Sequence, residues 1–200
     1  MKIKPIKKIN ILLQILMIPR FISTFLHESG HARKIIKANK KLAINEKVIV
    51  IIGCRALLRD TNFKHNVFET KNIIYVFFNN WWYYPDNAKT IGFTECSDHL
   101  KYDNDSIKSI AKAGIMNILI IFPCIIIILF SLCVLSLIYS NLTAFIILFY
   151  YMSFFFILAI LEFTGLKEKT DYKNYKHTEN FKIKKSEYDE ILNILKRNKN

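Results

Sequence analysis

Residues 113–161 have the sequence AGIMNILIIFPCIIIILFSLCVLSLIYSNLTAFIILFYYMSFFFILAIL and contain no Asp, Glu, Lys, Arg or His. This uncharged block runs for 49 residues in a chain of 200 residues, of which 22% are charged. A helix or strand of a water-soluble domain would carry charges on its solvated face well within that length, and one bilayer crossing needs only about 20 apolar residues. A single soluble domain is therefore excluded.

The uncharged block is divided by Ser140 and Asn141 into two apolar halves, 114–139 and 142–161. At about 1.5 Å per residue, each half is long enough to cross a hydrocarbon layer of roughly 30 Å. Backbone groups in lipid must be hydrogen-bonded within the chain, which favours helices. We therefore expect a transmembrane helical hairpin over residues 113–161.

The basic residues lie on both sides of this hairpin. Residues 33–112 contain 14 Lys and Arg, residues 167–200 contain 10, and the connector at Ser140 and Asn141 contains none. The positive-inside rule then predicts that both flanks are cytoplasmic. Flanks that face anionic lipid account for the net charge of +13, and no motif indicates a nucleic-acid partner. We expect a multi-pass protein of the cell membrane.

The N-terminal apolar stretch, residues 9–26, follows four lysines and is interrupted by Pro19 and Arg20. No small-residue cleavage site follows it, so we interpret it as a third membrane helix rather than a signal peptide. A helix that spans from there would leave the four lysines outside, which the charge rule disfavours. A re-entrant first segment is the alternative.

Runs of β-branched and aromatic residues predict short strands between the first helix and the hairpin, within residues 47–58, 72–84 and 90–95. The aromatic residues 81–84 would suit either the lipid headgroup level or the core of a small sheet. Near the C-terminus, residues 186–195 have the pattern of a capped amphipathic helix. The expected parts are thus a first membrane helix (1–32), a cytoplasmic segment with strands (33–112), the hairpin (113–161) and a basic cytoplasmic tail (162–200).

Residues 27–31 are His-Glu-Ser-Gly-His, which is the pattern H-E-x-x-H. On a helix, His27 and His31 share one face, so both imidazoles can bind one metal ion, with Glu28 beside it. Zinc binds neutral imidazole and activates a bound water, and a nearby carboxylate can accept the proton as that water attacks a peptide carbonyl. The alternative is a pair of solvated histidines at a helix end capped by Gly30.

Two stretches resemble the site-2 protease type of intramembrane zinc metalloproteases. FLHESGHA, residues 25–32, matches the family's H-E-x-G-H pattern. AKAGIMNILI, residues 111–120, is similar to the family's Ala-Gly-Pro-x-x-Asn start of the next membrane helix, with Gly114 and Asn117 kept and Ile115 in place of Pro.

A third stretch, LEFTGLKEKTDYKNY at residues 161–175, is similar to the family's Asn-Leu-x-Pro followed by Asp-Gly. Here Glu162 replaces the Asn, no Pro follows, and Asp171 is followed by Tyr172. Together the three stretches extend over most of the chain. The resemblance also implies strands in the cytoplasmic segment that help to present an extended substrate.

The resemblance implies a role for five residues. His27, His31 and Asp171 would be zinc ligands, Glu28 the general base, and Asn117 a group that helps to position the substrate or the oxyanion. From the residues alone, Asn117 could equally make an interhelical hydrogen bond, and Asp171 could be a solvated acid of the tail. Glu46 follows the motif at a distance that also suits a third ligand of a soluble zinc protease.

The expected fold is therefore an α-helical polytopic membrane protein, with a three-helix transmembrane catalytic core and a small cytoplasmic β-strand insert. We expect it to use Zn²⁺ to hydrolyse peptide bonds of membrane-inserted or membrane-proximal peptides, with its active site toward the cytoplasm. The second hypothesis is a catalytically silent membrane protein of the same fold that binds a peptide or protein partner. The departures at Ile115, Glu162 and Tyr172 favour this second hypothesis.

Overall fold

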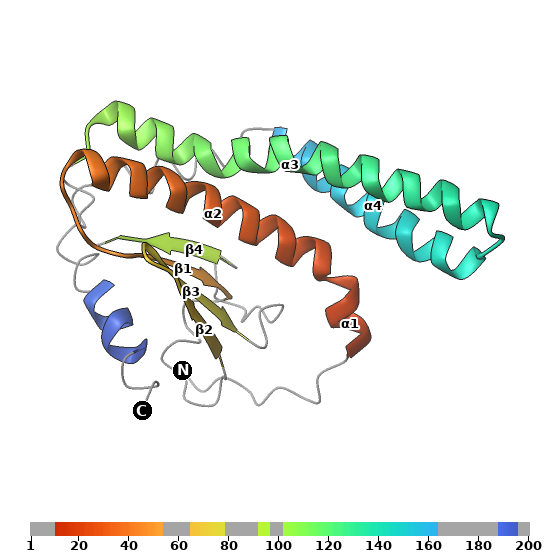
Figure 1. Ribbon diagram of the computed structural model, residues 1–200, viewed down its shortest axis with the longest axis horizontal. Coiled ribbons are helices and arrows are strands. Elements are labelled where there is room, and N and C mark those ends of the chain that lie inside the picture. Colours follow the sequence, from red (N-terminus) through yellow and green to blue (C-terminus); the bar gives the residue numbers. More distant parts are fainter. Residues whose placement is uncertain (1–10, 54–64, 79–91, 97–101, 164–187, 196–200) are drawn as a thin grey trace.

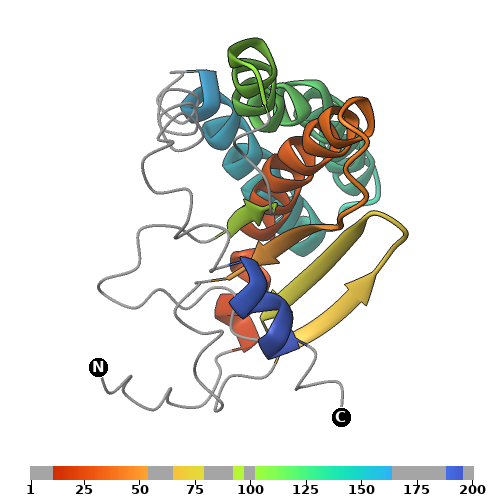
Figure 2. The ribbon, with the colours of Figure 1, turned by 90° about the vertical axis from the view of Figure 1, so that its left-hand side faces the viewer.

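The computed structural model describes residues 11–53, 65–78, 92–96, 102–163 and 188–195 (Figure 1). Helices α2, α3 and α4 lie together, and the α3–α4 hairpin extends well beyond the rest of the protein. A four-stranded sheet lies against α2, and a short helix at residues 188–195, here called the tail helix, covers the other face of the sheet (Figure 2).

The predicted hairpin is formed by α3 (Asn104–Ile138) and α4 (Leu142–Phe163). Among the described helices, these two are long and apolar enough to cross a membrane. Ser140 adopts a left-handed conformation at the turn, with φ of 52°. The Asn141 side chain then accepts a hydrogen bond from the Ala144 N–H at 3.0 Å and so caps the start of α4.

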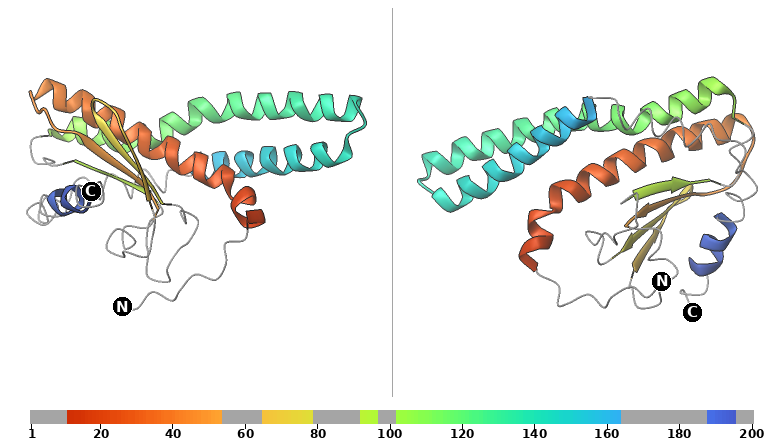
Figure 3. Two further views of the ribbon diagram at one scale, coloured as in Figure 1. Left: turned by 60° about the horizontal axis from the view of Figure 1, so that its bottom comes forward. Right: turned by 180° about the vertical axis from the view of Figure 1, so that it is seen from behind.

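The N-terminal stretch differs from the single helix that hydropathy predicts. It forms α1 (Ile11–Leu16) and α2 (Ile18–Lys41), with a break at Met17 just before Pro19. Because proline lacks a backbone N–H and fits the first helical turn, the new helix begins there. α1 turns away from the line of α2 (Figure 3). Neither helix qualifies as a membrane span, so the expected three-helix transmembrane core is not confirmed.

The far end of α2 also differs from the prediction, because the helix continues through the expected boundary at residue 32 to Lys41. Its charged residues Lys34 and Lys37 are exposed, whereas Ile35 and Ala38 are buried against the sheet. The His-Glu-Ser-Gly-His motif therefore lies inside a long helix. The interpretation of Gly30 as a helix-end cap is wrong.

The first half of α2 packs against the hairpin. Ile22 and Leu26 contact a cluster whose buried members are Ile118 and Phe122 of α3 and Phe155 of α4. The rings of Phe122 and Phe155 meet edge to face, 5.1 Å between centroids. Three helices thus meet beside the motif, although only α3 and α4 have the length and composition of a membrane span.

The sheet has the order β2-β3-β1-β4. β1 (Val48–Ile52) pairs in parallel with β3 (Ile73–Phe78) and antiparallel with β4 (Gly92–Glu95), and β2 (His65–Glu69) pairs antiparallel with β3. The three predicted runs contain β1, β3 and β4, whereas β2 was not predicted. The aromatic residues 81–84 lie outside the described residues.

Both faces of the sheet are covered, because β1 alternates its side chains between two clusters. Val48, Val50 and Ile52 pack toward α2. Ile49 and Ile51 pack toward the tail helix, whose Tyr188, Ile191 and Leu195 are buried against them. The expected amphipathic helix is present, and its apolar face is used to close the second face of the sheet.

Candidate metal centre

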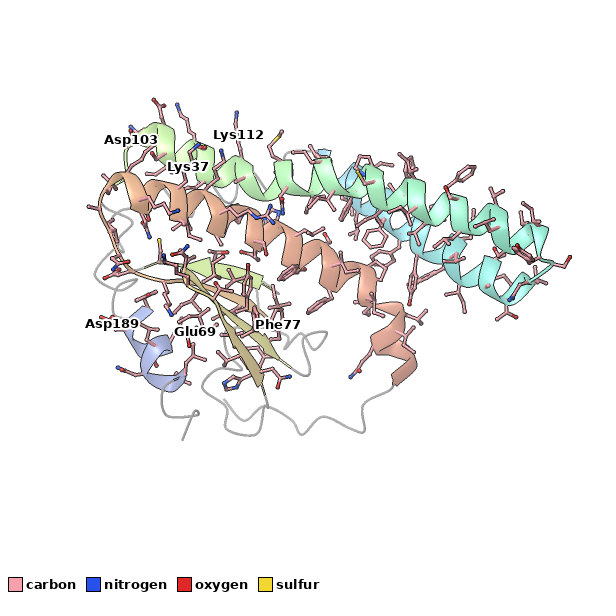
Figure 4. The ribbon with its side chains drawn as sticks, viewed as in Figure 1. Lys37, Glu69, Phe77, Asp103, Lys112 and Asp189 are labelled. Carbon is pink, nitrogen blue, oxygen red and sulfur yellow. The ribbon has the colours of Figure 1, made fainter. Side chains whose placement is uncertain are left out.

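Helices α2 and α3 run antiparallel and bring the first two sequence motifs together. Along the contact, Leu26 lies beside Asn117, Gly30 beside Ala113, and His31 beside Ile110. The last charged residue before the uncharged block, Lys112, lies at this level on α3 (Figure 4), and apart from Arg20 the basic residues of α2 begin just beyond the motif, at Arg33. The motif is therefore at the edge of the uncharged block of α3.

Two glycines allow the helices to approach this closely. A methyl group at Gly30 would lie 2.4 Å from the Ala113 carbonyl oxygen. A methyl group at Gly114 would lie 2.7 Å from His31 Nε2 and 2.8 Å from His27 Nε2. At these distances a Cβ atom at either position would overlap its neighbours. Because residue 114 is glycine, the backbone of α3 lies directly against both imidazoles.

The two histidines are buried, with His27 6% exposed and His31 2% exposed. His31 Nδ1 lies 2.7 Å from the Ile110 carbonyl oxygen. A carbonyl can only accept a hydrogen bond, so Nδ1 carries the proton and Nε2 of the neutral ring is left with its lone pair. This is the tautomer that a metal ligand at Nε2 needs.

The two Nε2 atoms are 3.1 Å apart. Two imidazole nitrogens bound to one tetrahedral zinc at about 2.0–2.1 Å would be separated by about 3.3 Å. Without a metal, the same separation suits a hydrogen bond from His27 Nε2–H to the lone pair of His31 Nε2. The arrangement of the two rings therefore fits two ligands of one zinc ion with little movement.

Glu28 is held on the side of α2 that faces β4. The Thr94 hydroxyl lies 2.8 Å from Glu28 Oε2 and 3.0 Å from the Glu28 backbone carbonyl. A methyl group at Gly92 would lie 2.4 Å from Thr24 Cγ2 and 3.1 Å from Glu28 Cγ. Edge strand β4 therefore packs closely on α2 and fixes the glutamate, which is 8% exposed.

Asn117 joins the two helices at the other side of Gly30. Its Nδ2 donates to the Leu26 carbonyl at 2.5 Å, and its Oδ1 accepts from Arg33 Nη1 at 3.3 Å. The interhelical hydrogen bond is thus present, one residue before His27. The same bond fixes the asparagine near the motif, where the resemblance implies its positioning role.

Among the described residues, no group of three His, Cys, Asp or Glu side chains could hold a metal ion. Asp171 lies outside these residues. Glu46 lines a cavity of about 340 Å³ between the sheet and the tail helix, together with Glu69 and Tyr188, and so does not join the histidines. α4 ends at Phe163.

Sequence reasoning identified the two histidines, the glutamate and Asn117, which the structure brings together, but it missed Thr94 and Gly92. Both lie in a run that was predicted only as a strand. Their contact with Glu28 joins residues 66 positions apart in the chain, and no local pattern carries such information.

Comparison of the chain with protein-family models, with curated protein sequences and with solved structures gives no match.

Proposed function

We propose that this protein is a membrane-embedded zinc metalloprotease. The observation that carries the proposal is the joint placement of three side chains: two buried histidines whose Nε2 atoms are 3.1 Å apart, and Glu28 fixed beside them by Thr94. Solvated histidines at a helix end would show neither the burial nor the defined tautomer. His27, His31 and Asp171 would hold the ion, and zinc bound there would supply an activated water and polarise the substrate carbonyl.

Glu28 is the proposed general base. The Thr94 hydroxyl donates to one carboxylate oxygen and so fixes the orientation of the carboxylate. The second oxygen, Oε1, remains to accept a proton from the attacking water and pass it to the leaving amine.

The substrate is proposed to bind along β4. Among the described strands, β4 pairs only with β1, so its other edge is available for an added strand. A peptide on that edge would pass Glu28 and the two histidines. Because the motif lies at the edge of the uncharged block, the substrate would be a membrane-inserted or membrane-proximal segment, unwound at the cut.

The test measures zinc content and proteolysis in the same preparations. Purified wild-type protein should contain about one zinc per chain, and His27→Ala or His31→Ala should remove most of it. Glu28→Gln should keep the metal and lose cleavage. Cleavage is measured by comparing the protein N-termini found in membranes that contain the wild type with those found in membranes that contain Glu28→Gln. His65→Ala, a histidine of β2, is the matched control. Zinc without any Glu28-dependent cleavage would favour the silent, partner-binding alternative.

The third ligand is tested separately. Asp171→Ala should weaken zinc binding and abolish cleavage, whereas Glu162→Gln and Glu46→Gln should retain the metal. Loss of zinc in Glu162→Gln alone would show that the third motif was misaligned.

A further inference from the structure

Arg20 is a charged residue among apolar helices. It is half-buried in α2, between Leu16, whose carbonyl accepts a hydrogen bond from the Tyr150 hydroxyl at 3.1 Å, and Leu26, whose carbonyl contacts Asn117. Tyr150 lies near the middle of α4, which begins at Leu142. Arg20 is therefore level with the apolar part of the hairpin.

Arg20 lies on the same face of α2 as the candidate zinc ligands. At about 100° per residue, seven residues separate Arg20 from His27 by only about 20° around the helix. Thr24 lies between them, and its hydroxyl donates a hydrogen bond to the Arg20 carbonyl at 3.0 Å. Arg20, Thr24, His27 and His31 thus form a polar stripe along one face of this half of α2.

Strand β4 runs beside this stripe. Thr94 contacts Glu28, and Gly92 lies against Thr24, so two residues along the strand span the same length as four residues along the helix. Two strand residues rise by roughly 6.6 Å and four helical residues by roughly 6 Å, so the two lengths agree. A peptide added to the outer edge of β4 would therefore continue from Glu28 toward Arg20. The axial distance of about 12 Å corresponds to three or four extended residues.

The hairpin offers no counter-ion for this guanidinium, because residues 113–161 contain no acidic side chain. Within the part of the chain that the structure describes, no carboxylate forms an ion pair with Arg20. A charge at membrane depth is costly and normally pairs with a partner or faces a polar path. The polar stripe and the adjacent edge of β4 indicate that this partner belongs to a peptide bound along the strand.

We propose that Arg20 recognises a carboxylate of the bound peptide, three or four residues to the membrane side of the cut. This inference rests on the proposed protease function for the position of the cut. An Asp or Glu side chain and a free C-terminal carboxylate share the required chemistry, since either can accept two hydrogen bonds from the guanidinium.

The experiment measures binding rather than cleavage. Full-length Glu28→Gln protein in phosphatidylcholine nanodiscs is titrated with three fluorescein-labelled ten-residue peptides of Val, Leu and Thr, followed by anisotropy. One carries an internal Glu and an amidated C-terminus, one has Gln in its place, and one has Gln and a free C-terminal carboxylate. At least one carboxylate peptide should bind roughly tenfold or more tighter than the neutral peptide.

The same titration with Arg20→Gln should give equal affinities for all three peptides, and Arg20→Lys should keep part of the preference because it retains the charge but loses the planar pair of donors. Lys37→Gln, which removes an exposed positive charge from the same helix, is the matched control and should keep the full preference for the carboxylate peptide. Far-ultraviolet circular dichroism of each variant reports whether the fold is intact. The peptide that is preferred identifies the source of the carboxylate.

Equal binding of all three peptides to the Arg20-containing protein would overturn the inference, as would a preference that survives in Arg20→Gln. Failure of the protease proposal gives a different result. Cleavage would then be missing in the wild type, whereas the Arg20-dependent binding preference would remain.

Discussion

Strand β1 and the α3–α4 hairpin are built from the same residue types but have opposite surroundings. The five residues of β1, Val-Ile-Val-Ile-Ile, are all 0% exposed, because α2 covers one face and the tail helix the other. In the hairpin, Ile127 is 65% exposed and Ile128 is 59% exposed. Apolar composition alone therefore does not distinguish a core buried by the protein from the exposed surface of helices long enough to cross a membrane. The candidate metal centre lies where the two regions meet.

The largest expected effect concerns which solvent each region contacts, tested by thiol labelling in intact cells. In a variant without the native cysteines, Ser140→Cys at the hairpin tip should label only from outside, and Lys71→Cys in the β2–β3 turn only from the cytoplasm. The hairpin would then be in lipid and the sheet in water. Labelling of both positions from one side would break the comparison.

Labelling of Lys4→Cys in the same background tests the N-terminal stretch. The hydroxyls of Tyr150 and Tyr151 donate to the carbonyls of Leu16 and Ile15, where α1 ends, at 3.1 Å and 2.8 Å. These bonds satisfy backbone groups at a helix break near mid-depth of α4, as a re-entrant segment requires. We expect Lys4→Cys to label from the cytoplasm. Labelling from outside would mean that the first segment crosses after all.

Gly114→Ala should have the next largest effect, at the junction of the two regions. Alanine is favoured over glycine in a helix by about 1 kcal/mol, so local stability would predict a gain. The added methyl group would instead meet both Nε2 atoms at 2.7–2.8 Å, and we expect loss of the bound zinc. Zinc content by mass spectrometry is the measurement, with Met116→Ala on the exposed side of α3 as control. Full zinc in Gly114→Ala would contradict the proposed ligand geometry.

A matched pair of cavity variants compares the two regions directly. Ile51→Ala in β1 should lower the free energy of unfolding by about 2–5 kcal/mol, because it leaves a cavity in a closed core. Ile127→Ala on the exposed face of α3 should cost less than about 1 kcal/mol, because detergent or lipid fills the space. Urea unfolding in micelles measures both. Equal costs would mean that Ile127 is packed against protein.

Tyr188→Phe tests how firmly the tail helix closes the sheet. The Tyr188 hydroxyl donates to the Lys47 carbonyl at 2.6 Å, and we expect a loss of about 1 kcal/mol. Burial, with further contributions from nearby Glu46, Cys96 and Asp189, raises the pKa of Tyr188 well above its usual value. Its contribution to stability is thus present below the unfolded pKa near 10 and is lost as pH rises through the folded pKa.

Hydrogen exchange of residues 188–195 is the readout for Tyr188. The amides of the tail helix in wild-type protein should lose protection in strong alkali. In Tyr188→Phe, their protection should already be lower at neutral pH, and the part of the alkaline loss that depends on tyrosine ionisation should be missing. An unchanged wild-type profile across the alkaline range would show that the tyrosine does not titrate with undocking.

Asp103→Asn should have the smallest effect. Asp103 caps α3 by accepting the Ser106 N–H at 2.7 Å, and hydrogen bonds from the Ser106 side chain and backbone lower the pKa of its carboxyl group. The stabilising contribution is present above the usual pKa near 3.8 and is lost as pH falls through the lower folded value. Asparagine also caps helices, so the variant should match wild type at neutral pH and differ only in acid. Thermal unfolding across the acidic range measures this difference.

Much of the fold could be predicted from local pattern. The uncharged block predicted both hairpin helices, with the turn at Ser140 and Asn141. β-Branched runs predicted β1, β3 and β4, because these strands are apolar. β2, His-Asn-Val-Phe-Glu, is an edge strand with mostly exposed side chains, and its composition does not differ from that of a loop.

The remaining differences arise from long-range contacts. Hydropathy ended the first helix near His31, but α2 continues because the sheet buries Ile35 and Ala38. The spacing of Ala32, Ile35 and Ala38 carried this signal, although the lysines between them obscured it. The site could be predicted as far as its local motif. Thr94 and the contact of Gly114 with the imidazoles depend on the packing of distant elements.

The hydrogen bond from His31 to the Ile110 carbonyl has a thermodynamic consequence. It joins a proposed zinc ligand to the backbone of α3, so metal affinity and α2–α3 association become linked equilibria. Any condition that holds the two helices together raises the affinity for the ion, and binding of the ion strengthens the helix pair by the same free energy. Bilayer thickness or lateral pressure, which act on the hairpin, would then alter metal occupancy without touching a ligand.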